Sequence, residues 1–309
     1  MGPEISVVIP VYRSASTLPT LHQRLTAALT ALVDERYEIV YVDDVSPDNA
    51  WEVLQELKGD DVRTVLLRLM QNSGQQRAVI CGVAHARGEH IVTMDDDLQQ
   101  RPEEIEILYR EFQATSADVV IGSYPRKKHG FARKLGTAVV RRLAQTTVGA
   151  PRDLEFTSFR IFSRAVGERL ARQRNPSPVV GFLLLAVTRN IRNVPVSHDE
   201  RHEGRSTYSV RRLIEYFSQM ILDYSDLPLR LVGYLGFLVA LGSFGLGIYY
   251  FSRALFGGFS VQGWATIVLL ICFFSGLILM SLGVIGVYLM RVLRSVNVGQ
   301  LYDVKEVIR

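Results

Sequence analysis

Short apolar runs alternate with segments of helical periodicity in the first part of the chain. The apolar runs are predicted to be strands, at residues 5–11, 38–42, 62–69, 89–94 and 117–122. A helix after the first strand is predicted from apolar residues at the spacing of one helix face, Leu18, Leu21, Leu25 and Leu29. Further helices are predicted over residues 75–86 and from Pro102 onward, and Ser46 followed by Pro47 has the pattern of a helix start. This order predicts an α/β fold with a mainly parallel sheet covered by helices on both faces.

The last third of the chain has a different pattern. Residues 231–252 carry no charged side chain, and none lies between Arg253 and Arg291. A membrane helix needs about 20 apolar residues, so we predict two transmembrane helices, at 231–252 and 264–290. The alternative is a buried helical hairpin of a soluble protein, but uncharged runs of this length are rare in soluble cores.

Basic residues flank both predicted spans, namely Arg211, Arg212 and Arg230 before the first, and Arg291, Arg294, Lys305 and Arg309 after the second. The positive-inside rule therefore places both termini in the cytoplasm. The N-terminus shows no signal-peptide pattern, and Cys81 and Cys272 give no disulfide framework, which fits a reducing compartment.

Four regions follow from these patterns. Residues 1–206 are predicted to be a cytoplasmic domain, 207–230 a juxtamembrane amphipathic helix, 231–290 a transmembrane hairpin and 291–309 a cytoplasmic tail.

Acidic residues follow two of the predicted strands directly. Asp43 and Asp44 come after the second strand, and Asp95, Asp96 and Asp97 after the fourth. Ligands of open α/β sheets bind at the carboxyl ends of the strands, so these carboxylates mark a predicted binding site. The sequence lacks a GxGxxG turn after the first strand and a GxxxxGK[ST] motif, which argues against a dinucleotide oxidoreductase and a P-loop NTPase.

Three consecutive carboxylates indicate a divalent cation. Asp95 and Asp97 are two positions apart and are expected to face the same side. Mg²⁺ or Mn²⁺ takes oxygen ligands, commonly one or two carboxylates together with substrate phosphates. A metal held in this way would make a nucleoside diphosphate a better leaving group. The alternative is a solvated acidic turn.

A basic segment follows the fifth predicted strand. No acidic residue lies between Asp118 and Asp153, whereas this interval contains Arg126, Lys127, Lys128, Arg133, Lys134, Arg141, Arg142 and Arg152. Such a segment is typical of phosphate binding. Because the same chain carries predicted membrane spans, we expect a lipid phosphate as the partner and no nucleic acid.

Several motifs resemble those of family-2 glycosyltransferases with the GT-A fold: residues 6–12 (SVVIPVY), 42–48 (VDDVSPD) and 94–99 (MDDDLQ). Residues 202–209 (HEGRSTYS) and 227–230 (LPLR), followed by two spans, resemble the polyprenyl-phosphate glycosyltransferases. That group includes dolichyl-phosphate mannose synthases, bactoprenol glucosyltransferases and undecaprenyl-phosphate 4-deoxy-4-formamido-L-arabinose transferases. Residues 72–75 (NSGQ) are most similar to the last of these.

The resemblance implies a function. A sugar is expected to move from a nucleotide-sugar, with UDP as the expected nucleotide, to undecaprenyl or another polyprenyl phosphate. The reaction is expected to be metal-dependent and inverting, at the cytoplasmic face of a bacterial inner membrane, and its product to serve glycan or lipopolysaccharide modification. Tetrameric relatives make a homo-oligomer a further expectation. Glucose, galactosamine, mannose and modified arabinose all remain open as the sugar.

The resemblance also implies site residues. The nucleotide-sugar is expected to contact Pro10, Tyr12, Asp43, Asp44, Asp96, Gln99, Arg201 and Ser206. The metal is expected to bind Asp95, Asp97 and Gln99, and the acceptor phosphate Arg126, Lys127 and Arg133. Asp95, Asp97 and Arg205 are the expected catalytic residues.

One departure bears on mechanism: Ser158 stands where many relatives carry an Asp for which catalytic work has been proposed. A phosphate monoester already carries about −1.5 to −2 charges at pH 7, so it needs positioning more than a base. Gln71 and Val287 also differ from the residues usual in the family at these positions, and we interpret both as subfamily differences.

Three other functions remain open. One is a membrane glycosyltransferase acting on another lipid such as diacylglycerol. A processive polysaccharide synthase is disfavoured, because neither Trp51 nor Trp264 lies in a Gln-x-x-Arg-Trp motif. The last is a non-catalytic nucleotide-binding membrane scaffold.

Overall fold

The computed structural model describes residues 2–124, 154–175, 178–197, 199, 227–256, 263–296 and 301–309. By its contacts the chain divides into two compact units. Unit 1 comprises Met1–Thr207 together with Val298–Arg309, and unit 2 comprises Tyr208–Asn297.

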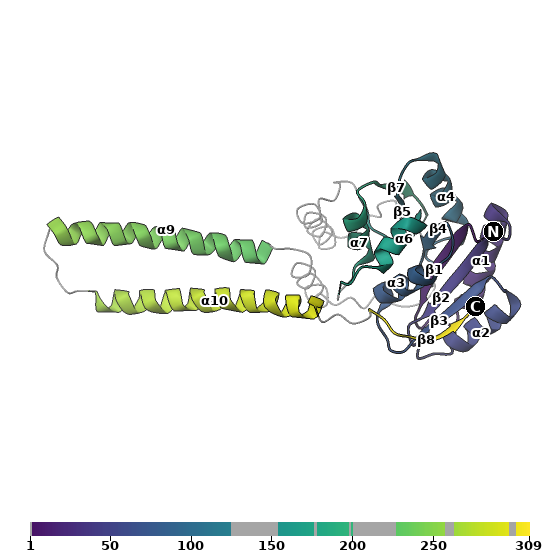
Figure 1. Ribbon diagram of the computed structural model, residues 1–309, viewed down its shortest axis with the longest axis horizontal. Helices are drawn as coiled ribbons and strands as arrows, with labels where there is room; N and C mark the ends of the chain where they lie inside the picture. The colour runs from purple at the N-terminus through teal and green to yellow at the C-terminus, as the bar shows by residue number, and fades with distance from the viewer. Residues whose placement is uncertain are drawn as a thin grey trace. The chain divides into compact units, whose positions relative to one another are not determined.

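Unit 1 is built on a sheet of eight strands in the order β7-β5-β6-β4-β1-β2-β3-β8 (Figure 1). The strands are β1 Ile5–Val11, β2 Tyr37–Asp43, β3 Thr64–Leu69, β4 His90–Thr93, β5 Val119–Ser123, β6 Arg160–Ser163, β7 Ile191–Pro195 and β8 Val304–Ile308. The pairs β1–β2, β1–β4, β2–β3 and β5–β7 are parallel. The pairs β4–β6, β5–β6 and β3–β8 are antiparallel, so the sheet is mixed and mostly parallel.

Helices cover both faces of this sheet, as the alternating pattern predicted. The helices of unit 1 are α1 Leu18–Val33, α2 Ala50–Asp60, α3 Gln75–His85, the 3₁₀ turn η1 Pro102–Glu104, α4 Ile105–Ala114, α6 Arg164–Ala171 and α7 Val180–Val187. The apolar residues of α1, α2 and α4 form one core with alternate residues of β1 and β2. The opposite face packs against α3 and α6.

The packing of α3 on the sheet depends on Gly82. A Cβ at this position would lie 2.3 Å from Val8 Cγ1 and 3.0 Å from Val42 Cγ2. The absence of a side chain therefore allows the helix to approach β1 and β2 closely, and this close approach fixes the position of the turn that leads into α3.

The predicted helix start at Ser46 is wrong. The helix α2 begins at Ala50, with Asn49 in the N-cap position. The backbone N–H of Ser46 instead donates to Asp43 Oδ1 at 3.0 Å, and its Oγ accepts the N–H of Arg13 at 3.3 Å. A side chain that bonds neighbouring backbone groups competes with helix formation, so Ser46 closes a turn after β2.

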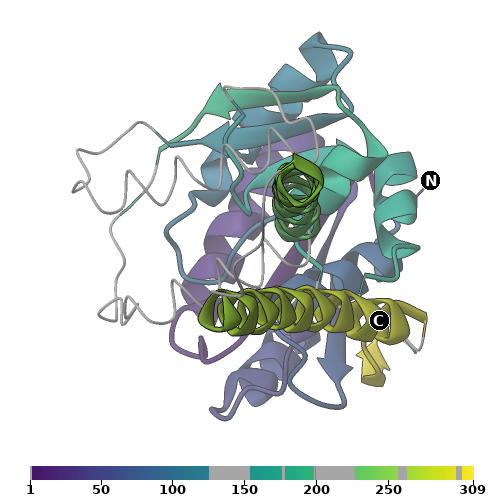
Figure 2. The ribbon, with the colours of Figure 1, turned by 90° about the vertical axis from the view of Figure 1, so that its left-hand side faces the viewer.

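The segment predicted as a tail over 291–309 contains a strand of the sheet. Figure 2 shows β8, in yellow, at one edge of the sheet, where it pairs with β3. The register joins Leu66 to Ile308, and the N–H of Met70 donates to the carbonyl of Asp303 at 2.8 Å. An unpaired edge strand exposes a row of backbone donors and acceptors, and β8 supplies their partners along β3.

Unit 2 contains two long helices, α9 Leu227–Phe256 and α10 Trp264–Val296, which contact each other. They include both stretches that the sequence predicted as spans. In the described part of the chain, one stretch, Phe273–Met290 of α10, is long and apolar enough to cross a membrane. Many large apolar side chains of both helices are exposed, among them Phe237, Phe244, Phe273 and Leu279. Membrane crossing by α9 and α10 stays a prediction.

Substitutions in β8 test its role in the sheet. Ile308 packs against the core of unit 1, whereas Val307, beside it, is 45% exposed. We expect Ile308→Asp to destabilise unit 1 by about 1–3 kcal/mol, because a carboxylate replaces a partly buried alkyl group. Val307→Asp should change stability by less than about 0.5 kcal/mol. Thermal unfolding followed by circular dichroism compares the two, and equal shifts would show that β8 does not pack as described.

Candidate functional site

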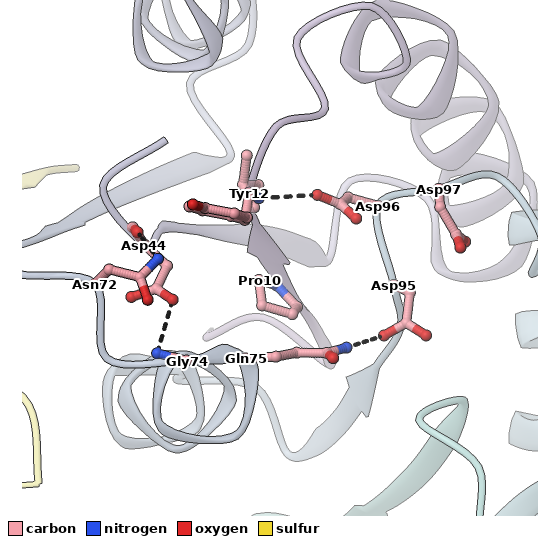
Figure 3. A pocket seen from close by; sticks show the side chains of 10 residues that line it. Pro10, Tyr12, Asp44, Asn72, Gly74, Gln75, Asp95, Asp96 and Asp97 are labelled. Atoms are coloured by element: carbon pink, nitrogen blue, oxygen red, sulfur yellow. Dashed lines mark hydrogen bonds between the residues drawn. The ribbon is translucent and has the colours of Figure 1, made fainter. Parts of the chain in front are cut away.

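A cavity of about 400 Å³ opens at the carboxyl ends of β1, β2, β3 and β4 (Figure 3). Six of the residues predicted from the sequence line it: Pro10, Tyr12, Asp44, Asp95, Asp96 and Asp97. Val11, Asn72, Gly74 and Gln75 complete the lining. The position agrees with the general location of ligands in open α/β sheets.

Asp44 connects the end of β2 to the turn between β3 and α3. Its Oδ1 accepts the N–H of Ser73 at 2.6 Å and its Oδ2 accepts the N–H of Gly74 at 2.8 Å. The Asn72 Nδ2 donates to the Asp44 carbonyl at 3.0 Å. Burial raises the pKa of the Asp44 carboxyl, and the two N–H groups act in the opposite direction. Asp44 thus shapes one wall of the cavity by holding this turn in place.

Asp43 lies behind this wall and does not line the cavity. Its side chain is fully buried, its Oδ1 accepts the N–H of Ser46, and its Oδ2 is 3.4 Å from Arg68 Nε. The Arg68 guanidinium lies over the Trp51 ring, 5.1 Å from its centroid. Burial raises the pKa of Asp43. Its predicted contact with a nucleotide stays a prediction, whereas its contacts in the structure support the turn after β2.

Asp96 ties the loop after β1 to the loop after β4. Its Oδ2 accepts the N–H of Tyr12 at 3.1 Å and the hydroxyl of Ser14 at 2.5 Å, and its carbonyl accepts the hydroxyl of Thr17 at 2.8 Å. Figure 3 shows the carboxylate turned toward Tyr12. Burial raises the pKa of Asp96 to about 6. This anchoring leaves the Tyr12 ring, whose residue is 44% exposed, at the cavity.

Asp95 is held by side chains. Its Oδ1 accepts from Gln75 Nε2 at 2.6 Å, and its Oδ2 accepts from Gln100 Nε2 at 3.0 Å and from the Ser158 hydroxyl at 2.5 Å. Burial raises the pKa of Asp95, and the bond from Ser158 acts in the opposite direction.

Asp97 begins a tight turn. Its Oδ1 accepts the N–H of Gln99 at 3.2 Å, and Leu98 between them has a φ of 61° and a buried side chain. Asp97 lines the cavity, whereas Gln99, predicted as a metal ligand, does not. The Gln99 carbonyl accepts the N–H of Asp199 at 3.0 Å.

Unusual backbone conformations gather around this cavity. Positive φ angles occur at Arg13 (59°), Val45 (57°), Gly74 (88°) and Leu98 (61°), each in a loop that follows a strand at this edge. A left-handed conformation is costly for a β-branched residue such as Val45. Strain of this kind persists where surrounding contacts impose it and is concentrated at functional sites.

The donor set fits a divalent cation bound together with phosphates. In the parts of the chain that the structure describes, no three His, Cys, Asp or Glu side chains are arranged to hold a metal by themselves. Asp95 and Asp97, the two carboxylates predicted as metal ligands, both line the cavity. Mg²⁺ is commonly bound by one or two carboxylates, with substrate phosphates and water completing its shell.

Other predicted site residues lie outside the described residues, namely Arg126, Lys127, Arg133, Arg201, Arg205 and Ser206. Conversely, the functional prediction from sequence missed Gln75, Gln100 and Ser158 as partners of Asp95. The polar, glycine-containing run 72–75, shortly after the third strand, was the available signal for Gln75. Ser158 stood out only as a departure from its relatives, and its contact with Asp95 joins positions 63 residues apart.

Gly74 provides a test of the cavity wall. Its φ of 88° is open to glycine and strained for alanine, although a Cβ there would meet nothing within 4 Å. We expect Gly74→Ala to lower the free energy of unfolding by about 1–3 kcal/mol. It should also loosen the hydrogen bonds to Asp44 and weaken binding of UDP, the expected nucleotide, about tenfold. Gly59→Ala is the matched control, because its Cβ also meets nothing within 4 Å and its φ is ordinary. Calorimetric titration with UDP compares them, and unchanged affinity in Gly74→Ala would contradict this role.

Comparisons with known proteins agree with this geometry. Residues 6–170 match the family Glycosyl transferase family 2. Among solved structures, the chain is similar to glucosyl-3-phosphoglycerate synthase from Mycobacterium tuberculosis in complex with Mn²⁺, UDP-glucose and phosphoglyceric acid. The TM-score is 0.51 at 18% sequence identity, and the match covers 72% of this chain and 79% of the synthase. The complex of the same synthase with Mn²⁺, UDP and phosphoglyceric acid also gives a TM-score of 0.51 at 18% identity, and this match covers 72% of this chain and 77% of the synthase. At this identity the likeness shows the shared fold, and the family match spans more than half of the sequence. The chain therefore belongs to glycosyl transferase family 2.

Proposed function

We propose that this glycosyltransferase moves a sugar from a nucleotide-sugar, with UDP as the nucleotide, to a polyprenyl phosphate such as undecaprenyl phosphate at the cytoplasmic face of a membrane. The observation that carries the proposal is the carboxylate-lined cavity of unit 1 in the same chain as two long helices with exposed apolar side chains. The cavity takes the donor, and the helices bring the enzyme to a lipid acceptor.

The cavity suits a nucleoside diphosphate sugar. Its volume of about 400 Å³ is within the range of small-molecule sites. The exposed Tyr12 ring offers a surface for a base, and Asp95 and Asp97, which both line the cavity, would share a metal with the diphosphate. A bound Mg²⁺ or Mn²⁺ would neutralise charge on the departing diphosphate. The related synthase from Mycobacterium tuberculosis has been solved with Mn²⁺ and UDP-glucose, which supports this choice of cofactor and donor.

The connectivity of the chain supports a membrane hairpin. The chain leaves unit 1 before α9 and rejoins its sheet as β8 after α10. Both outer ends of the helical pair are therefore tied to the same soluble unit, so the pair crosses a membrane an even number of times if it crosses at all. Two crossings with unit 1 in the cytoplasm satisfy this constraint, and they also place the basic residues that flank the spans in the cytoplasm, as the positive-inside rule requires.

The reaction is an inverting single displacement. A phosphate oxygen of the acceptor attacks the anomeric carbon, a new carbon–oxygen bond forms, and the bond from that carbon to the diphosphate breaks as UDP leaves. Because the phosphate is already anionic, no side chain is needed to remove a proton. The basic segment from Arg126 to Arg152 has the charge to bind this phosphate.

Detergent-purified protein tests the proposal. It would be incubated with Mn²⁺ or Mg²⁺, a panel of nucleotide-sugars and, in separate reactions, undecaprenyl phosphate, diacylglycerol or 3-phosphoglycerate. We expect mass spectrometry to show undecaprenyl phosphate gaining one sugar, with loss of product in EDTA. Asp97→Asn should lower kcat about 100-fold or more, the scale of losing one group that stabilises transition-state charge. Asp60→Asn, at the exposed end of α2, is the matched control and should leave the rate unchanged.

Other outcomes would replace the proposal. Sugar transfer to diacylglycerol alone would identify a different lipid acceptor, and transfer to 3-phosphoglycerate alone would identify a soluble phosphate acceptor. Metal-dependent UDP binding without product from any donor and acceptor would favour a non-catalytic scaffold.

A further inference from the structure

Ser158 lies two residues before β6, next to the end of β4. Thr93, the last residue of β4, donates its hydroxyl to the Ser158 carbonyl at 2.6 Å, and it pairs with Arg160 in the register of the sheet. The backbone of Ser158 is therefore fixed to the strand that leads into the acidic run Asp95, Asp96 and Asp97. A side chain at position 158 reaches Asp95 without any loop movement.

The hydrogen bonds among Ser158, Gln100 and Asp95 have a single consistent direction. The N–H of Asp95 donates to Gln100 Oε1 at 3.0 Å, so Gln100 Nε2 is the amide atom that faces the carboxylate. Gln100 Nε2 donates to Ser158 Oγ at 2.6 Å and to Asp95 Oδ2 at 3.0 Å. The Ser158 hydroxyl proton is then directed to Asp95 Oδ2, at 2.5 Å. Donation from a hydroxyl to a carboxylate is a charge-assisted and comparatively strong bond.

These contacts leave one part of the Asp95 carboxylate available. An ionised carboxylate accepts at about four positions. Ser158 and Gln100 take both positions on Oδ2, and Gln75, which lines the cavity, takes one on Oδ1 at 2.6 Å. The remaining acceptor position is on Oδ1, the oxygen bonded by a cavity-lining residue. Ser158 and Gln100 therefore orient the carboxylate so that an acceptor position on Oδ1 is left for a ligand in the cavity.

A buried arginine explains why a neutral donor suits position 158. Arg160 is 5% exposed, and its Nε is 3.4 Å from the Ser158 carbonyl. Burial lowers its pKa to about 10, and Asp95 is the charge that opposes this shift. One buried cation thus faces one carboxylate. A second carboxylate at position 158 would lie against Asp95 Oδ2 and repel it.

We propose that Ser158 is a positioning residue, whose hydroxyl orients the Asp95 carboxylate for a divalent metal bound with the donor diphosphate. This inference rests on the proposed function for the identity of the donor. Ser158 acts through Asp95 and takes no proton in the transfer.

The test measures metal-dependent nucleotide binding, which requires no acceptor. UDP would be titrated into the purified full-length protein at a series of Mn²⁺ concentrations, by calorimetry. We expect Ser158→Ala to raise the Mn²⁺ concentration for half-maximal UDP binding about tenfold, the scale of losing a hydrogen bond to a charged group or an outer contact to a metal ligand. UDP binding in EDTA should not change. Ser158→Thr keeps the hydroxyl and should restore the wild-type Mn²⁺ dependence.

Two further variants separate charge from packing. Ser158→Asp should weaken Mn²⁺-dependent binding at least as much as Ser158→Ala, because it adds a negative charge beside Asp95. Ser123→Ala is the matched control: its hydroxyl contacts the Val194 carbonyl at 3.3 Å at the end of β5, with no bond to Asp95. It should match the wild type.

Several results would overturn the proposal. Wild-type Mn²⁺ dependence in Ser158→Ala would do so, and so would an equal loss of UDP binding with and without metal, which indicates general disruption of the site. Tighter Mn²⁺-dependent binding in Ser158→Asp would refute the role of charge. Failure of the lipid-transfer assay would leave this binding test intact, so the two failures are distinguishable.

Discussion

Carboxylates crowded at one edge of a sheet must each find separate hydrogen-bond donors, and this requirement organises the candidate site. Parallel strands end at the same edge, so the acidic residues after β2 and β4 are brought together. Burial raises the pKa of Asp43, Asp44, Asp95 and Asp96. Different partners compensate each one: backbone N–H groups for Asp44, Arg68 and a turn N–H for Asp43, and hydroxyl or amide donors for Asp95 and Asp96.

This division gives the carboxylates distinct tasks. Asp44 and Asp96 accept from the backbone of neighbouring loops, so they set the shape of the cavity. Asp95 accepts from side chains, and its orientation depends on residues from α3, the loop after β4 and the segment before β6. A site arranged in this way resists collapse without a ligand, because the walls are held by bonds that do not involve the donor.

The sequence predicted much of the fold and part of the site, for identifiable reasons. Strands such as β1 and β2 are buried on both faces, so they read as continuous apolar runs, and the acidic residues at their ends followed directly. The short strands β6 and β7 have no such signature. Ser46 was predicted to start a helix because its local pattern fits an N-cap. In the structure its backbone N–H donates to Asp43 and its hydroxyl accepts from the N–H of Arg13. The contacts of Ser158 with Asp95 and Gln100 join distant segments of the chain, which local patterns do not reveal.

The pairing of β8 with β3 makes α9 and α10 an insertion within the catalytic domain. During synthesis, β3 emerges early, but its partner is made only after both long helices. One edge of the sheet therefore stays open while the two long helices are synthesised. Completion of the sheet therefore waits for synthesis of the helical pair, and a chain that stalls before β8 leaves β3 as an unpaired edge strand.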